Sequence, residues 1–211
     1  MRFVFITLAV LWFAGLRAVA GAAGEEADDS FVYRWTGLKG SVHISNSLKS
    51  VPGQYLKNVK KIKRIEISSA GKRRKPVFAT VEGEARINFS LNDNAMIAPA
   101  VFNGSVKRNV LIDTGSELVT ITTKLARALG YDYENMRKAW FQTQSGPILA
   151  PVIKIERLAM GRAQVTGLEA AVIDFKGRGP VSAVAGMNFL SAFIFEIDTQ
   201  KRSLTLTSPG N

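Results

Sequence analysis

The chain has 211 residues, of which 46% are hydrophobic and 21% charged, values typical of globular proteins. It contains no cysteine and one histidine, His43, which excludes disulfides, thiol catalysis and a zinc site built from cysteine and histidine. The formal net charge of +11 favours partners or surfaces that carry negative charge.

The N-terminus has the pattern of an export signal over residues 1–23. Arg2 gives a positive start, residues 3–16 are an apolar run, and residues 18–20 (Ala-Val-Ala) offer a small-residue cleavage site. The run is short for a membrane-spanning helix, but Arg17 just before the cleavage site leaves open an uncleaved tether. We therefore expect an exported protein that is periplasmic or envelope-associated, and the lack of cysteine suits a bacterial envelope.

Residues 24–50 predict a polar lead-in followed by a small β-hairpin module. Two short alternating runs, 31–36 and 41–45, flank the turn 37–40. The pattern Tyr-Arg-Trp, a glycine turn, then Val-His-Ile-Ser resembles a small module of exported bacterial proteins. An isolated hairpin is marginally stable, so we expect it to dock on the rest of the chain. Its aromatic side chains then either form a ligand-binding face or pack inward.

Residues 51–80 predict a basic linker, with Pro-Gly at 52–53 as a break. Nine lysines and arginines lie between Lys57 and Lys75, against one acidic residue, Glu66. This segment either binds an anionic envelope surface or is a solvated connection. We do not expect nucleic acid as a partner of an exported chain.

From residue 77 onward the sequence predicts a mostly β architecture with short helices. Residues 77–89 suggest one or two strands, and helical patterns occur at 123–130, 133–141 and 187–192. Further strands are predicted at 97–102, 105–112, 118–122, 148–158, 162–173, 182–186, 193–197 and 203–207.

Asp113-Thr114-Gly115-Ser116 is the motif most indicative of chemistry. It follows an Asn-Gly hairpin turn and the apolar run 110–112, which places a carboxylate on a tight turn at the end of a buried strand. A carboxylate in that setting is costly unless it is hydrogen-bonded or reactive. The other interpretation is an Asx turn, in which Asp113 accepts a hydrogen bond from its own backbone two residues on.

The stretch 95–207 resembles the retropepsin-like aspartic proteases, in particular their exported bacterial branch. The resemblance rests on the hairpin leading into Asp113, the following short helix ending at Gly130, and the run 183–190, where Asn188 replaces the family's aspartate. It implies a closed β-barrel half with short helices over residues 81–211. It also implies a catalytic Asp113, an active-site support of Thr114, Gly115, Ser116, Ala185 and Gly186, and a substrate flap at Gln144, Ser145 and Gly146.

A single Asp-Thr-Gly-Ser motif supplies only one of the two carboxylates that share a proton in aspartic catalysis. The second would come from another copy of the chain, which predicts a homodimer. Asp174 and Asp198 are weaker alternatives within the chain. This reading requires no metal or cofactor and predicts an aspartic endopeptidase acting on peptides. The rival readings are a non-catalytic module that binds a peptide or protein partner, and an envelope-associated structural protein.

Overall fold

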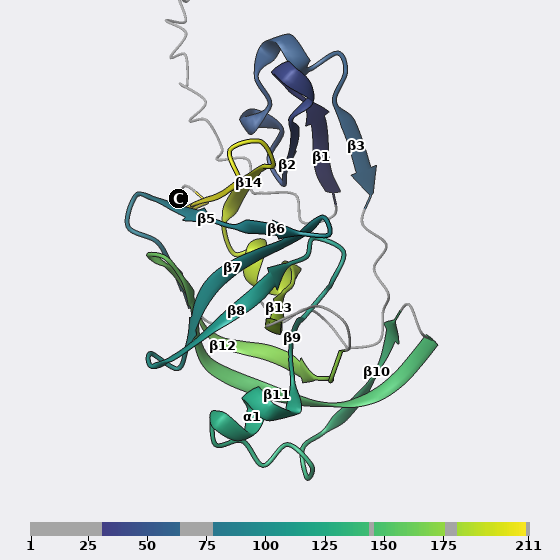
Figure 1. Ribbon diagram of the computed structural model, residues 1–211, viewed down its shortest axis with the longest axis vertical. Coiled ribbons are helices and arrows are strands. Elements are labelled where there is room, and N and C mark those ends of the chain that lie inside the picture. Colours follow the sequence, from purple (N-terminus) through teal and green to yellow (C-terminus); the bar gives the residue numbers. More distant parts are fainter. Residues whose placement is uncertain (1–30, 64–77, 144–145, 176–180, 210–211) are drawn as a thin grey trace, which may run out of the picture.

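Strands make up most of the protein, whose computed structural model describes residues 31–63, 78–143, 146–175 and 181–209 (Figure 1). The predicted mostly β class is therefore confirmed. The predicted strands from residue 97 onward are all present, with ends that differ from the prediction by at most two residues. The predicted signal at 1–23 and the basic residues 64–75 lie outside the described residues.

One sheet closes on itself. Its six ring strands hydrogen-bond in the order β11, β12, β9, β13, β8, β7, and β7 pairs back to β11. Three further strands, β6, β10 and β4, extend from β7, β11 and β12 respectively. The strands are β4 (Phe78–Thr80), β6 (Ser90–Asn92), β7 (Ala95–Phe102), β8 (Val106–Ile112), β9 (Val119–Ile121), β10 (Lys138–Thr143), β11 (Gly146–Met160), β12 (Ala163–Val172) and β13 (Val181–Ala185).

The interior of this ring is the main hydrophobic core. Apolar side chains alternate along its strands, so that every second residue is buried, as in Ile153, Ile155 and the facing strand residues Val165 and Ala163. The turn between β7 and β8 contains Asn103-Gly104, both with positive φ, as the sequence predicted. The core thus fixes the ends of β8 and β13, which lead into the turns at Asp113 and Gly186 described below.

The second sheet joins distant parts of the chain. Strand β2 of the predicted N-terminal hairpin pairs with the closing strand β14, so the hairpin docks as expected (Figure 1). The order is β3, β1, β2, β14, β15, β5. These strands are β1 (Phe31–Thr36), β2 (Val42–Ser45), β3 (Lys60–Lys63), β5 (Glu84–Asn88), β14 (Ile194–Asp198) and β15 (Ser203–Thr207).

The aromatic residues of the hairpin pack inward. Trp35 is 2% exposed and forms a small cluster with Tyr33 and Val51, and its ring stacks on that of His43. These aromatic side chains therefore pack inside the protein and do not form an open ligand-binding face.

Part of the segment expected to be a linker is folded. Strand β3 pairs with β1 and strand β4 pairs with β12, both within residues 51–80. Strand β3 was not predicted, because its lysines are typical of a solvated linker. In the structure they lie on an exposed edge strand, where charge blocks further pairing. Short 3-10 turns precede it: η1 (Leu38–Gly40), η2 (Leu48–Ser50) and η3 (Gly53–Tyr55).

Two short α-helices occur among the described residues, α1 (Thr123–Ala128) and α2 (Met187–Leu190). The third helical pattern, at 133–141, was wrong, because residues from Lys138 form β10. Trp140, Phe141 and Thr143 favour an extended backbone, and β10 gains a full antiparallel register with β11. No helix in the described part of the chain is long and apolar enough to cross a membrane.

Candidate active site

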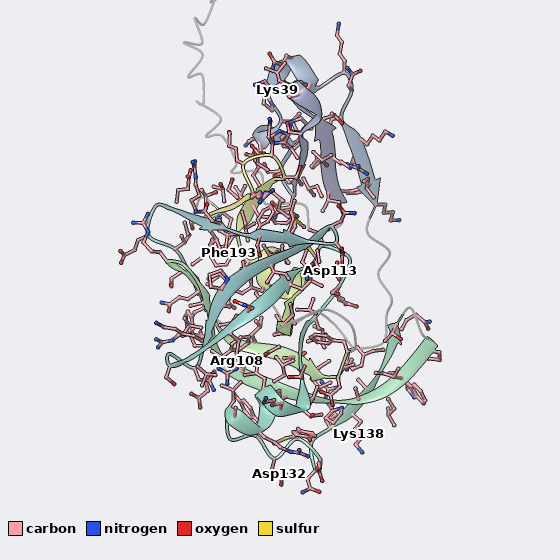
Figure 2. The ribbon with its side chains drawn as sticks, in the orientation of Figure 1. Lys39, Arg108, Asp113, Asp132, Lys138 and Phe193 are labelled. Atoms are coloured by element: carbon pink, nitrogen blue, oxygen red, sulfur yellow. The ribbon has the colours of Figure 1, made fainter. Side chains whose placement is uncertain are left out.

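Asp113 lies directly after β8, at the edge of the ring sheet (Figure 2). Because β8 and β13 pair in parallel, the segments that follow them leave the sheet at the same end. The backbone N–H of Asp113 donates to the carbonyl oxygen of Ala185, the last residue of β13, at 3.1 Å. The structure therefore brings together the two motifs that the sequence placed about 70 residues apart.

Both carboxylate oxygens of Asp113 accept a hydrogen bond from the motif itself. The N–H of Gly115 donates to Oδ1 at 2.9 Å, and the hydroxyl of Ser116 donates to Oδ2 at 2.8 Å. The Asx turn and the candidate catalytic group are thus the same feature, not alternatives. Asp113 is half-buried, so its carboxylate is oriented by the motif and remains accessible to solvent.

The two glycines of the site permit close backbone approach. A Cβ on Gly186 would lie 2.6 Å from the carbonyl carbon of Leu118 and 3.0 Å from the carbonyl oxygen of Ser116. A Cβ on Gly115 would lie 3.1 Å from Oδ1 of Asp113. Gly186 is therefore required where the turn after β13 packs on the loop after Asp113, and Gly115 leaves room beside the carboxylate.

Asn188 contributes to the site in a way that the sequence did not reveal. Its side chain bridges Val119 of β9 and Glu169 of β12, and its backbone N–H donates to Glu117 at 3.0 Å. The sequence marked this residue only as a departure from the family pattern. A signal was present, since Asn188 is the one polar residue in an otherwise apolar and glycine-containing run from Ala183 to Leu190.

Gly146 of the predicted flap is the first residue of β11, which pairs with β10 as an antiparallel hairpin. Thr143 pairs with Gly146, and the Thr143 hydroxyl donates to the Gly146 carbonyl oxygen at 2.7 Å. Gly146 has φ of +109°, a value that favours glycine. Gln144 and Ser145 lie outside the described residues. The hairpin exposes Trp140 and Leu149, which are cross-strand partners.

The two other nominated aspartates serve different turns. Asp174 accepts hydrogen bonds from the N–H and the hydroxyl of Thr123, at the start of α1. Asp198 accepts hydrogen bonds at Oδ1 from the N–H groups of Gln200 and Lys201, both at 2.9 Å. In the described residues no hydrogen bond or ion pair joins either carboxylate to Asp113, so neither completes a carboxylate pair with it.

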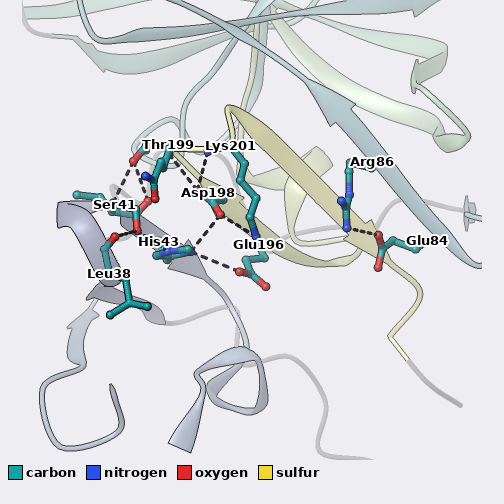
Figure 3. Close-up of polar contacts among 11 residues, drawn as sticks. Leu38, Ser41, His43, Glu84, Arg86, Glu196, Asp198, Thr199 and Lys201 are labelled. Carbon is teal, nitrogen blue, oxygen red and sulfur yellow. Dashed lines mark hydrogen bonds and ion pairs between the residues drawn. The ribbon is translucent and has the colours of Figure 1, made fainter. Parts of the chain in front are cut away.

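Asp198 belongs to a polar cluster that ties the N-terminal strands to the closing hairpin (Figure 3). Nδ1 of His43 lies 3.5 Å from Glu196 Oε1 and 3.9 Å from Asp198 Oδ2, and Lys201 Nζ lies 3.4 Å from the same Asp198 oxygen. Burial acts to raise the pKa of Asp198, but the backbone N–H of Lys201, the positive field of His43 and the Lys201 ammonium outweigh it. The net effect is a lowered pKa.

His43 meets both carboxylates and a serine hydroxyl in the folded chain. Ser41 Oγ lies 3.0 Å from Nε2 of His43, opposite the two carboxylates (Figure 3). The arrangement is structural, because Ser41 is 7% exposed and its hydroxyl donates to the carbonyl oxygen of Leu38. The described residues contain no group of three or more His, Cys, Asp or Glu side chains that could hold a metal ion.

Comparison with known proteins agrees with the resemblance to aspartic proteases that the Asp113 and Gly186 turns suggest. The family model described as aspartyl protease matches residues 98–189, which include both. Among solved structures, the chain is similar to a retropepsin-like aspartic protease from Rickettsia conorii, with 24% identity over 62% of this chain and 94% of that one, and a TM-score of 0.49. None of the curated proteins compared with the chain matches it. Residues 98–189 of the chain are therefore similar to the aspartyl protease family, which agrees with the resemblance of its motifs.

Proposed function

We propose that the protein is an exported aspartic endopeptidase that works as a homodimer. The observation that carries this proposal is the Asp113 carboxylate, oriented by hydrogen bonds to both oxygens and still half exposed. A structural Asx turn needs only the first of these bonds. The hydroxyl of Ser116 fixes the second oxygen, which is what a carboxylate in a defined reactive orientation requires.

The need for a second copy follows from the surroundings of Asp113. Two facing carboxylates cannot both ionise, so they share one proton. A single carboxylate has no second group with which to share a proton. Within the described residues Asp174 and Asp198 are committed elsewhere. A twofold axis beside Asp113 would bring the same residue from the partner subunit into place. The Thr114 hydroxyl has no hydrogen bond in the described part of the chain, and we assign it to the partner's loop.

The reaction then follows from the protonation of the pair. The ionised Asp113 accepts a proton from a water molecule as the water oxygen attacks the peptide carbonyl carbon. The protonated Asp113 of the partner subunit donates to the carbonyl oxygen, and the tetrahedral intermediate collapses with proton transfer to the leaving nitrogen. No metal or cofactor takes part in these steps.

The β10–β11 hairpin is the proposed flap over the peptide. The proposed flap residues are Gln144, Ser145 and Gly146, of which Gly146 is described: it pairs with Thr143 and has a positive φ. An extended peptide beside such a hairpin gains main-chain hydrogen bonds, which favours polypeptide substrates over small molecules.

Export and surface attachment complete the proposal. Residues 1–23 would direct the chain to the periplasm or envelope and either be removed or remain as a tether. The segment Lys57–Lys75 would bind an anionic envelope surface. Its described lysines, Lys57, Lys60, Lys61 and Lys63, are exposed, which supports such contact.

The test compares Asp113→Asn with Asp174→Asn on a mixed peptide library from mildly acidic to neutral pH. Asp174 is a matched control, because its carboxylate also follows a strand and also accepts from a backbone N–H and a hydroxyl. We expect Asp113→Asn to lose at least about 10³-fold in kcat, and Asp174→Asn to keep its activity. Equal activity of Asp113→Asn and the unmodified protein would end the protease proposal. Peptide binding without cleavage by the unmodified protein would favour the non-catalytic binding module.

A further inference from the structure

Asn188 joins three segments around the Asp113 turn. Its Oδ1 accepts from the N–H of Val119 at 2.8 Å, and its Nδ2 donates to the carbonyl oxygen of Glu169 at 2.8 Å. Its own N–H donates to the carbonyl oxygen of Glu117 at 3.0 Å. One half-buried residue therefore holds the end of the loop after Asp113, the start of β9 and the middle of β12.

The two side-chain bonds require a carboxamide. The N–H of Val119 can only donate and the carbonyl oxygen of Glu169 can only accept, so the bridging group must accept on one atom and donate on another. An ionised aspartate accepts only, and it would place negative charge against the Glu169 carbonyl oxygen. A hydrocarbon side chain would leave both backbone groups unpaired, each at a real energetic cost. The neighbours thus also fix which way the amide points.

The loop that Asn188 holds is the one that orients the Asp113 carboxylate. Residues 114–118 contain both donors to that carboxylate, Gly115 and Ser116. At the loop's middle, the N–H of Met187 donates to the Ser116 carbonyl oxygen at 2.8 Å. At its end, Asn188 holds Glu117 and Val119. Displacement of that end would turn the Ser116 hydroxyl away from Oδ2.

We infer that Asn188 is a positioning residue for catalysis by Asp113, acting through the 114–118 loop. This inference rests on the proposed function for its catalytic readout. This role gives a chemical reason for the asparagine at position 188, where the family has aspartate. The site of this chain uses an amide N–H donor, and an ionised aspartate has none.

The variant Asn188→Asp tests the inference, because its hydrogen bonding at this position depends on pH. Above a pH of about 4 to 5 the new carboxylate is ionised and cannot donate to Glu169. Once protonated, it offers an O–H donor to the Glu169 carbonyl oxygen and keeps an acceptor for the Val119 N–H, so the bond to Glu169 can form again. We expect kcat of the variant at neutral pH to fall about 10- to 100-fold relative to the unmodified protein. The ratio should return toward one in acid, with KM little changed throughout.

Two comparison variants separate positioning from general damage. Asn188→Leu cannot regain either bond, so its kcat should be low at every pH. Asn103→Asp is the matched control, because Asn103 also accepts from a backbone N–H, that of Arg157, and donates, to the Tyr131 hydroxyl, at a distance from the site. Its kcat and pH profile should follow those of the unmodified protein. Should Asn188→Leu fail to fold, the pH-dependent recovery of Asn188→Asp still decides the question.

A second readout does not depend on proteolysis. The amide protection factor of Met187, whose N–H donates to the Ser116 carbonyl oxygen of the loop, should fall in Asn188→Asp at neutral pH and recover in acid, as followed by hydrogen exchange. If neither protein cleaves any peptide but this pattern appears, the proposed function fails and the positioning of the loop stands. If Met187 protection and the kcat ratio are both unchanged at neutral pH, the inference is overturned.

Discussion

Two Asp-Thr turns of this protein are alike in their local bonds and different in their surroundings. In both, Oδ1 of the aspartate accepts from the N–H two residues on, Gly115 after Asp113 and Gln200 after Asp198, each at 2.9 Å. Asp198 is 6% exposed and has a lysine ammonium and a histidine beside it. Asp113 is only partly buried and has no ion pair within the described residues. The turn alone therefore does not distinguish the two aspartates; burial and charged neighbours do.

The two turns are also supported from different places. The turn at Asp198 is closed within the β14–β15 hairpin, by residues that follow it immediately. The turn at Asp113 is held by Ala185, Met187 and Asn188, which lie at the end of the neighbouring strand β13 and directly after it, about 70 residues later in the chain. Four variants or mixtures test this contrast, and the largest effect is expected at Gly186.

Gly186→Ala should have the largest effect on stability. The added Cβ meets the backbone of Leu118 and Ser116, which cannot move without displacing the Asp113 loop. We expect the free energy of unfolding to fall by about 3 kcal/mol, measured by urea denaturation. Gly53→Ala is the control, since a Cβ there has no heavy atom within 4 Å. Equal stability of the two variants would mean that the loop after Asp113 adjusts freely.

Asp198→Asn should cost about 2 kcal/mol, because hydrogen bonds to a buried charged group are lost or weakened. The lowered pKa of Asp198 also sets a pH dependence. The unfolded chain takes up the proton first, so this stabilisation is complete above the ordinary aspartate pKa of about 3.9 and is lost as pH falls through the folded-state pKa. Denaturation at several pH values should show a smaller acid loss in the variant. Asp132→Asn, an exposed control, should leave that loss unchanged.

Mixing chains tests whether the missing partner of Asp113 comes from another copy. A ninefold excess of Asp113→Asn should lower the activity per unmodified chain about tenfold, because only about one partner in ten then carries Asp113. The same excess of Asp174→Asn should produce no such fall. Activity per unmodified chain that stays constant in the first mixture would exclude a shared site. All charged partners of Asp198 lie in its own chain, so no mixing effect is expected there.

Asp113→Asn should have the smallest effect on folding. The amide oxygen can still accept from Gly115, and the Ser116 hydroxyl can rotate to accept from the amide nitrogen. We expect the free energy of unfolding to change by less than about 0.5 kcal/mol, measured in the same urea series. A loss as large as that of Asp198→Asn would show that Asp113 is chiefly a structural turn residue.

Local patterns in the sequence were sufficient for much of this fold and site. Alternating apolar residues and the Asn103-Gly104 turn predicted the strands around Asp113, and the Asp-Thr-Gly-Ser motif predicted the carboxylate and its supporting glycine. Long-range pairing was beyond such reasoning. The bridge made by Asn188 and the contact of His43 with Glu196 depend on strands that meet only in the folded chain. Strand β10 was missed because an aromatic-rich segment suits a helix or a strand until its partner is known.

The pairing of β2 with β14 has a consequence for the order of events during synthesis. Ser45 donates to the carbonyl oxygen of Phe195, 150 residues later in the chain, and Asn46 spans a similar separation to Phe193. Contacts of such long range form slowly, because a large loop must close first. A chain emerging from the ribosome therefore cannot complete the second sheet until β14 has been made. The N-terminal strands must therefore wait for the last strands of the chain before this sheet can close.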